Sequence, residues 1–163
     1  MYFNYLGIKD GLPEGTATVL LQDREKYMWI GTQNGLVRCD GYATRKYDFE
    51  TKDINSSNIT ALFEGGRSNL WIGTINGLYR YNRSNDNVEK IKSNSYLDTC
   101  ACMMHYIKED HRNKLWIKAQ DMKSQMAMVG LIDPVINQRL PLPPLKYRVP
   151  YRSPTMVAAF QPV

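Results

Sequence analysis

Two aspartates at matching places in the chain are the residues best suited to acid–base chemistry. Asp23 and Asp110 each precede a tryptophan by six residues, at Trp29 and Trp116. A pair of carboxylates could serve as general acid and general base. Both aspartates, however, fall in short segments between two expected strands, where a carboxylate can accept backbone N–H groups and set a turn. We therefore expect a structural role for them and predict that the chain is not an enzyme.

The cysteines and histidines form no pattern that a metal site requires. Zinc sites need paired short spacings of ligands, whereas Cys39 lies far from Cys100 and Cys102 in the sequence, and His105 and His111 add no second pair. The cysteines are expected to be small buried residues with at most one disulfide. His105 falls in an expected strand and not in the helical hairpin that a phospho-accepting histidine would need. No metal or cofactor is predicted.

Amide side chains in expected loops offer the remaining chemistry, which is hydrogen bonding to a ligand. Asn, Gln, Ser and Thr side chains can share hydrogen bonds with sugar hydroxyls, although they are also ordinary loop residues. Function is often carried by loops that a rigid scaffold positions. The candidate ligand-binding residues are Gln33, Asn34, Asn55, Asn76 and Gln120.

A threefold sequence repeat must position these side chains. Its tryptophans lie 42 residues apart, from Trp29 to Trp71, and then 45 residues apart, from Trp71 to Trp116. This period is typical of a four-stranded propeller blade. The repeated phrases are Met28-Trp29-Ile30-Gly31-Thr32, Leu70-Trp71-Ile72-Gly73-Thr74 and Leu115-Trp116-Ile117-Lys118-Ala119.

Each of the first two phrases is followed by an Asn-Gly pair. Asn34-Gly35 and Asn76-Gly77 lie between β-rich runs, a pattern that predicts hairpins with type I′ turns, in which both residues have positive φ. In the third copy the corresponding glycine is expected to be Gly130, fourteen residues after Trp116. The third copy is therefore predicted to carry an insertion of eight residues.

Alternation along the second strand predicts how the blades pack. Trp29 and Gly31 fall on one face of the strand and Met28, Ile30 and Thr32 on the other. An indole beside a glycine suits a face against which another sheet packs closely. The residues expected to have this structural role are Trp29, Gly31, Gly35, Trp71, Gly73, Gly77 and Trp116.

The predicted fold is all-β, a β-propeller fragment of about three four-stranded antiparallel blades. Seven of the eight prolines lie between Pro134 and Pro162, which disfavours a further regular blade there. The expected segments are a lead-in with a possible ring-closing strand at 1–16, blade 1 at 17–57, blade 2 at 58–99, blade 3 at 100–140 with its insertion at 119–128, and a proline-rich tail at 141–163.

Residues 23–42, which read DREKYMWIGTQNGLVRCDGY, resemble the two-component regulator propeller repeat. Residues 3–13 resemble the stretch that leads into the first blade of such proteins, and the resemblance extends to about residue 133. The family usually has a glycine three residues after the aspartate, where this chain has Lys26, Ser68 and Asn113. Gly65 replaces the aspartate in the second copy, and Lys118 replaces the packing glycine in the third.

The resemblance implies the extracytoplasmic sensor region of a hybrid two-component histidine kinase, with a periplasmic location. Family members build seven-bladed rings, so three blades are expected to be an N-terminal part of one. Residues 1–20 lack a basic start followed by an apolar core, so no signal peptide is predicted in this chain. No apolar run has the length of a membrane span.

Composition sets few further limits. The net charge is +5, but the 21 basic residues are interspersed with acidic ones and form no nucleic-acid-binding module. No nucleic-acid partner is therefore predicted, although a basic surface could favour an acidic glycan.

These observations together favour a sensory propeller fragment that recognises an oligosaccharide in the control of polysaccharide utilisation. The alternatives are a propeller-type enzyme acting on glycans and a non-catalytic protein-interaction scaffold. Open blade faces at both ends of the fragment are expected to cause self-association.

Overall fold

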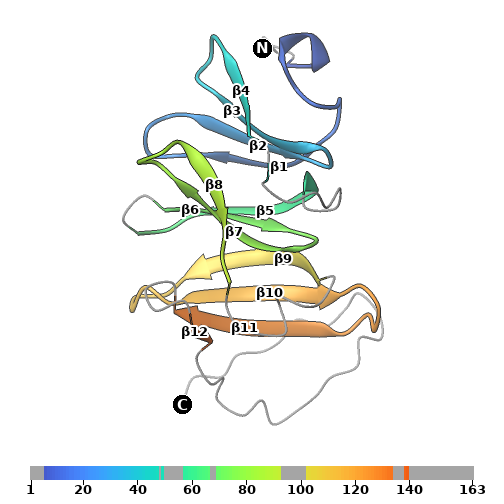
Figure 1. The fold of residues 1–163 in the computed structure, drawn as a ribbon, viewed down its shortest axis with the longest axis vertical. Coiled ribbons are helices and arrows are strands. Elements are labelled where there is room, and N and C mark those ends of the chain that lie inside the picture. Colours follow the sequence, from blue (N-terminus) through green and yellow to red (C-terminus); the bar gives the residue numbers. More distant parts are fainter. Residues whose placement is uncertain are drawn as a thin grey trace, which may run out of the picture.

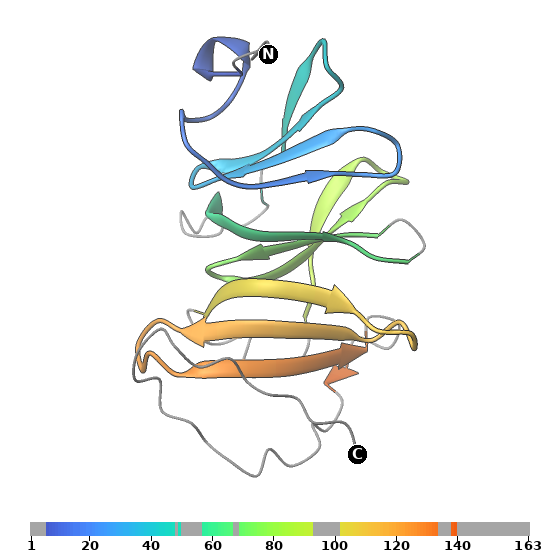
Figure 2. The same cartoon turned by 180° about the vertical axis from the view of Figure 1, so that it is seen from behind.

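The structure, a computed structural model, describes residues 6–47, 49, 57–66, 69–92, 102–133 and 138–139. These residues form a short 3-10 helix, η1, and three antiparallel sheets of four strands each, stacked along the long axis of the molecule (Figures 1 and 2). Each sheet contains four strands in chain order. The predicted fold class, three four-stranded propeller blades, is therefore confirmed.

The strands of blade 1 are β1 (Ala17–Gln22), β2 (Met28–Thr32), β3 (Gly35–Cys39) and β4 (Thr44–Tyr47). Those of blade 2 are β5 (Ile59–Glu64), β6 (Leu70–Thr74), β7 (Gly77–Asn82) and β8 (Asn87–Lys90). Those of blade 3 are β9 (Cys102–Glu109), β10 (Leu115–Asp121), β11 (Ala127–Asp133) and β12 (Gln138–Arg139). The three tryptophans occupy equivalent positions in the second strands, β2, β6 and β10.

Neighbouring blades pack through the tryptophan and glycine of the repeated phrase. Trp29 is 0% exposed and Trp71 is 1% exposed, each in a core shared with the following blade. A Cβ atom on Gly31 would lie 2.6 Å from Cγ2 of Ile59, and one on Gly73 would lie 2.9 Å from Cβ of Met104. No side chain fits at such a distance, which explains why both positions are glycine. The close approach of the next blade thus accounts for the packing role predicted for both glycines.

The hairpin turns differ from the predicted type. Thr32 pairs with Gly35, and Thr74 pairs with Gly77, so the second residue of each turn is asparagine and the glycine begins the next strand. Only the glycine of each Asn-Gly pair has positive φ, 139° at Gly35 and 131° at Gly77. The predicted type I′ turn is therefore wrong, because it requires positive φ at both central residues.

The third hairpin is longer than the other two, but by a different count from the predicted one. Trp29 pairs with a residue nine positions later, Arg38, whereas Trp116 pairs with a residue fifteen positions later, Leu131. The hairpin thus gains six residues and not eight. Gly130 pairs with Ile117 in the middle of β11, so it is not the counterpart of Gly35. The added residues lengthen β10 and β11 and form the turn between them.

The lead-in covers the outer face of blade 1. Residues 6–16 contain η1 (Ile8–Asp10) and turns, and no strand, so a ring-closing strand is not present in that range. Leu12, which is 7% exposed, packs with Ile30 and Val37 on the face opposite Trp29. The lead-in thus shields part of this face, while Leu20, which pairs with Ile30, is 61% exposed.

The described cysteines differ in state. Cys39 carries a free thiol at the end of β3, and Cys102 is disulfide-bonded and fully buried in β9. The expectation that the cysteines are small buried residues is thus incomplete. The expected maximum of one disulfide holds for the described part of the chain.

Lys26 offers a stability prediction. It has a φ of 73° in the turn between β1 and β2, and Asn113 has a φ of 58° at the equivalent place in blade 3. Because left-handed backbone costs a residue with a side chain about 1–2 kcal/mol, and glycine loses about 0.5–1 kcal/mol in chain entropy, we expect Lys26→Gly to stabilise the protein by about 0.5–1 kcal/mol in urea unfolding.

Asn113→Gly is the matched control, since asparagine tolerates this conformation better than lysine does. It should change the free energy of unfolding less than Lys26→Gly. A destabilising Lys26→Gly substitution would contradict the assignment of strain to this turn.

Candidate functional site

The predicted ligand-binding residues lie mainly at one edge of the stacked sheets. Gln33 and Asn34 form the turn between β2 and β3, and Asn76 lies in the equivalent turn between β6 and β7. Because both turns follow the second strand of neighbouring blades, they share one rim of the stack. We call Gln33, Asn34 and Asn76 the rim residues. Asn55 lies outside the described residues.

A buried threonine shapes each turn. The hydroxyl of Thr32 donates to the carbonyl of Gly35 at 3.0 Å and accepts from the N–H of Asn34 at 3.1 Å. Thr74 makes the same pair of contacts in blade 2, at 3.0 Å each, with Gly77 and Asn76. Both threonines are 0% exposed. The last residue of the phrase Trp-Ile-Gly-Thr therefore sets the backbone that presents each rim asparagine.

The two rim asparagines differ in their partners. In blade 1 the carboxylate of Glu14 accepts from the backbone N–H of Gln33 at 2.8 Å and from Nδ2 of Asn34 at 3.1 Å. In blade 2 the Nδ2 of Asn76 is buried and has no hydrogen-bond partner in the described part of the structure. Buried donors are nearly always satisfied. Asn76 thus differs from Asn34 in having a buried amide donor without a partner among the described residues.

Gln120 has a different setting from the other candidates. It lies in β10 and pairs with Met103 and Ala127 instead of occupying a loop. Its side chain lies 3.2 Å from Nε2 of His105 and donates to Oε1 of Gln125 at 2.8 Å. The side chain of Gln120 thus contacts residues of its own sheet. Gln120 does not lie in a loop, because the longer hairpin continues β10 past the position at which the rim turns begin in blades 1 and 2.

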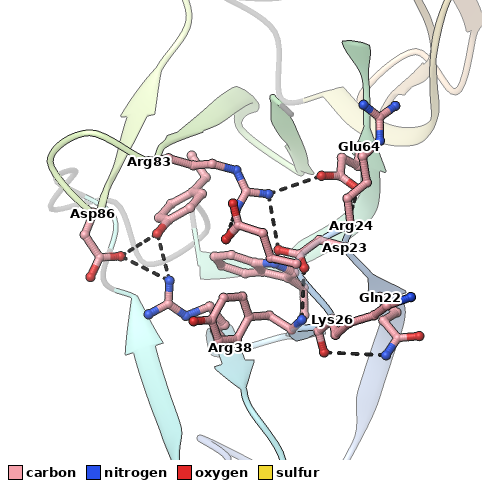
Figure 3. Close-up of polar contacts among 12 residues, drawn as sticks. Gln22, Asp23, Arg24, Lys26, Arg38, Glu64, Arg83 and Asp86 are labelled. Carbon is pink, nitrogen blue, oxygen red and sulfur yellow. Dashed lines mark hydrogen bonds and ion pairs between the residues drawn. The ribbon is translucent and has the colours of Figure 1, made fainter. Parts of the chain in front are cut away.

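A second polar cluster lies between blades 1 and 2 (Figure 3). It includes Asp23, which lies between β1 and β2 and therefore at the end of β2 opposite the rim residues. Asp23, 3% exposed, accepts from the N–H of Tyr27 at 2.9 Å and from Nε1 of Trp29 at 2.8 Å. Arg83 of blade 2 contacts the same carboxylate at 3.2 Å and also pairs with Glu25 and Glu64. The expected turn-setting role of Asp23 is present, and the carboxylate also joins two blades.

Asp110 repeats the turn, and its hydrogen bonds with described residues stay within blade 3. It accepts from the backbone N–H groups of Arg112 and Lys114 and from Nε1 of Trp116 at 3.2 Å. The hydrogen bond from Lys114 contributes most to holding the pKa of Asp110 below its ordinary value, and partial burial opposes it. An ionised carboxylate is therefore what this turn stabilises.

Blade 2 lacks the aspartate, and a neighbouring blade supplies the carboxylate. Gly65 stands at this position, and Nε1 of Trp71 has no hydrogen-bond partner in the described residues. A Cβ atom on Gly65 would lie 2.1 Å from Oε2 of Glu109, which accepts a hydrogen bond from the N–H of Gly66. The side chain of Glu109 thus occupies the space that an aspartate at position 65 would need. Glu64 accepts from the N–H of Arg24 in the same way between blades 2 and 1, at 2.9 Å.

Asp86 forms the outer part of the cluster. Its Oδ1 accepts from the hydroxyls of Tyr47 and Tyr81 at 2.6 Å each, and its carboxylate pairs with Arg38 and Arg45. Partial burial opposes ionisation, but the tyrosine hydrogen bonds and the two arginines outweigh it and lower the pKa of Asp86. Burial, with the hydrogen bond to Asp86, raises the pKa of Tyr47. At neutral pH the carboxylate is therefore ionised and the phenols are not.

Aromatic rings pack beside these charged side chains. The ring of Trp29 lies 5.3 Å from that of Tyr47 and 4.7 Å from that of Tyr81, centroid to centroid. The guanidinium of Arg38 lies 4.6 Å from the ring centroid of Tyr27. Each carboxylate of the cluster faces donors from the protein itself. The arrangement can hold two blades together, and it leaves none of these carboxylates poised as a general acid or base.

Several of these residues could not be assigned from the sequence. Thr32 and Thr74 belong to the repeated phrase, so the repeat was a usable signal for them. Arg83 and Asp86 lie in the turn between β7 and β8. Tyr81 is five positions from Asp86, but the other partners named above are 19 to 60 positions away. No local pattern marks such contacts.

Comparison with known proteins agrees with the repeat and the fold. Residues 11–34 and 53–76 match the two component regulator propeller family. No curated protein matches the chain. Among the described residues, no helix is long and apolar enough to cross a membrane.

Solved structures with a similar fold come from B. thetaiotaomicron. The extracellular domain of BT3049, described as a hybrid two component system, shares 18% identity over 77% of this chain, with a TM-score of 0.58. The extracellular domain of BT4673, described as a one component system, shares 20% identity over 82% of this chain, with a TM-score of 0.63. The chain spans about a fifth of each of these domains, 19% and 20%.

The buried hydroxyl of Thr32 gives a prediction. Thr32→Val keeps the shape but leaves the Gly35 carbonyl and the Asn34 N–H without this partner, so we expect a loss of about 1–3 kcal/mol in the free energy of unfolding. Urea denaturation measures it. Thr16→Val, at an exposed position, should change stability by less than about 0.5 kcal/mol. Equal effects of the two substitutions would show that the hydroxyl of Thr32 does not hold the turn.

The lowered pKa of Asp86 gives a second prediction. A carboxyl whose folded pKa is below its ordinary 3.8 stabilises the fold above that pH, and the contribution disappears as the pH falls through the folded pKa. We expect Asp86→Asn to destabilise the protein at pH 6 and to flatten the decline in stability below about pH 4. Asp110 should maintain a residual decline. Parallel stability curves for the variant and the original protein would contradict this expectation.

Proposed function

Because the chain carries repeats of the two component regulator propeller family, we propose that it is part of the extracytoplasmic sensory propeller of a two-component regulator. In this proposal the ligand is an oligosaccharide, and the longer protein that contains the chain controls polysaccharide utilisation. The propeller itself recognises the ligand without chemical turnover. Signal transmission then occurs through changes in packing between receptor chains.

The rim supports the ligand-binding part of this proposal. Two neighbouring blades present asparagines on turns whose backbone is set by buried threonines. An amide donor held in a fixed position can bond a sugar hydroxyl without losing much side-chain freedom. The pair of rim asparagines, held at equivalent places in neighbouring blades by buried threonines, is the single observation that carries the proposal.

The interior of the blade interface supports the non-enzymatic part. The buried Asp23 is bonded to Tyr27, Trp29 and Arg83, and Asp86 is bonded to two tyrosines and two arginines. Both carboxylates therefore already take part in hydrogen bonds and ion pairs that stabilise the fold. A glycan-active enzyme would need carboxylates that converge on a substrate. The carboxylates of this cluster instead accept hydrogen bonds from donors of the neighbouring blade.

The test is calorimetry with a panel of neutral and acidic glycans. We expect one of them to bind the complete ectodomain of the longer protein, and to bind this chain more weakly, since a site near the axis draws on several blades. Asn76→Ala should weaken binding by about two- to tenfold, as the loss of one hydrogen bond does.

Tyr42→Ser is the control, because Tyr42 is fully exposed in the turn between β3 and β4 at the opposite edge. It should leave the affinity unchanged. Turnover of a glycan would replace the proposal with the enzyme alternative, and an ectodomain that binds a protein but no glycan would replace it with the scaffold alternative.

A further inference from the structure

The rim turn of blade 1 already binds a carboxylate of the chain itself. Oε1 of Glu14 accepts from the backbone N–H of Gln33 at 2.8 Å, and Oε2 of Glu14 accepts from Nδ2 of Asn34 at 3.1 Å. The two donors therefore form a fork that matches the two oxygens of a carboxylate. Gln33 and Asn34 are both exposed, so the fork lies at the surface. The contact with Glu14 thus shows the geometry in which this turn binds a carboxylate.

Glu14 belongs to the lead-in and not to a sheet. The lead-in is anchored two residues earlier, where Leu12 packs on Ile30 and Val37. Beyond its chain neighbours, no described heavy atom lies within 4 Å of a Cβ atom placed on the next residue, Gly15. The side chain of Glu14 can therefore turn away from the rim while the buried contact of Leu12 is retained.

A lysine stands beside each of the two rim turns. Lys46 of β4 and Lys90 of β8 hold equivalent places in blades 1 and 2, and both are exposed. Cε of Lys46 lies 3.3 Å from the place that a Cβ atom on Gly35 would take, and Cε of Lys90 lies 3.2 Å from the corresponding place at Gly77. Since opposite charges attract, the two ammonium groups favour a negatively charged ligand over a neutral one at this rim.

We propose that the oligosaccharide contains a uronic acid, whose carboxylate takes the place of the Glu14 carboxylate on Gln33 and Asn34; this inference rests on the proposed function of the rim. Lys46 and Lys90 attract the same charge. Glu14 is then an internal occupant that blocks the turn until the ligand displaces it. A tethered carboxylate competes at a high effective concentration, so an uncharged hydroxyl group does not displace it.

Two small sugars test the required chemistry. Methyl β-D-glucuronide and methyl β-D-glucoside differ only in the carboxylate that replaces a hydroxymethyl group. At constant ionic strength, we expect the glucuronide to shift the NMR signals of the Gln33 backbone amide and the Asn34 side-chain amide, and the glucoside to leave them in place. Glu14→Ala should tighten glucuronide binding about tenfold, because it removes both the competitor and its negative charge. Loss of a residue that contacts the ligand would instead weaken binding.

Further variants separate charge from shape. Glu14→Gln keeps the size of the side chain but loses its charge, and it should give an affinity between those of the original protein and Glu14→Ala. Lys46→Gln and Lys90→Gln should each weaken glucuronide binding about two- to fivefold, since exposed charges are partly screened. Lys26→Gln is the matched control, because Lys26 is exposed at the opposite end of β2, and it should leave the affinity unchanged. Circular dichroism of every variant checks that the sheets are retained.

The proposal is overturned if folded Glu14→Ala binds the glucuronide no more tightly than the original protein, or if the glucoside binds as well as the glucuronide. It is also overturned if sulfate shifts the same signals equally, since the turn would then hold an adventitious ion only. A neutral glycan that binds the complete ectodomain, with no effect of Glu14→Ala, would retain the proposed function and reject this inference. Glucuronide binding at the turn without any glycan binding by the ectodomain would support the carboxylate site and reject the proposed function.

Discussion

The close approach of neighbouring sheets at Gly31 and Gly73 is the constraint on which this structure depends. At both positions a Cβ atom would fall within 3 Å of the next blade. The adjacent indoles fill the remaining space, and truncating such a buried tryptophan typically costs about 3–5 kcal/mol. The spacing between blades, and hence the relative placement of the rim turns, follows from this pairing of a very small residue with a very large one.

In blade 1 the N–H group of the buried indole has a carboxylate partner, which links the apolar interface to the polar cluster. Asp23 accepts from Trp29 and, through Arg83, joins blade 1 to blade 2. In blade 2 the aspartate is replaced by Gly65, and Glu109 of blade 3 enters the vacated space. The carboxylate at the second junction therefore comes from the following blade. It accepts from the backbone N–H of Gly66 and not from Nε1 of Trp71, which has no partner among the described residues.

The parts of the fold that the sequence predicted are those governed by local rules. The spacing of Trp29, Trp71 and Trp116 and the alternation around them were enough for the strands, the blade order and the packing glycines. The type I′ turns were predicted wrongly because the hydroxyls of Thr32 and Thr74 stabilise another geometry. Other features rest on contacts between residues distant in sequence, which no local pattern records: the packing of Leu12 on Ile30 and the hydrogen bond from Tyr47 to Asp86.

The same reasoning explains how the rim turns are built. A rim turn has its backbone held from below by a buried threonine, so its asparagine is presented at low entropic cost. The third blade departs from this plan, because Lys118 stands where the first two blades have their packing glycine and the longer hairpin continues the strands past the rim position. Both changes lie in one strand, β10, so a single element of the third blade alters its packing face and its edge.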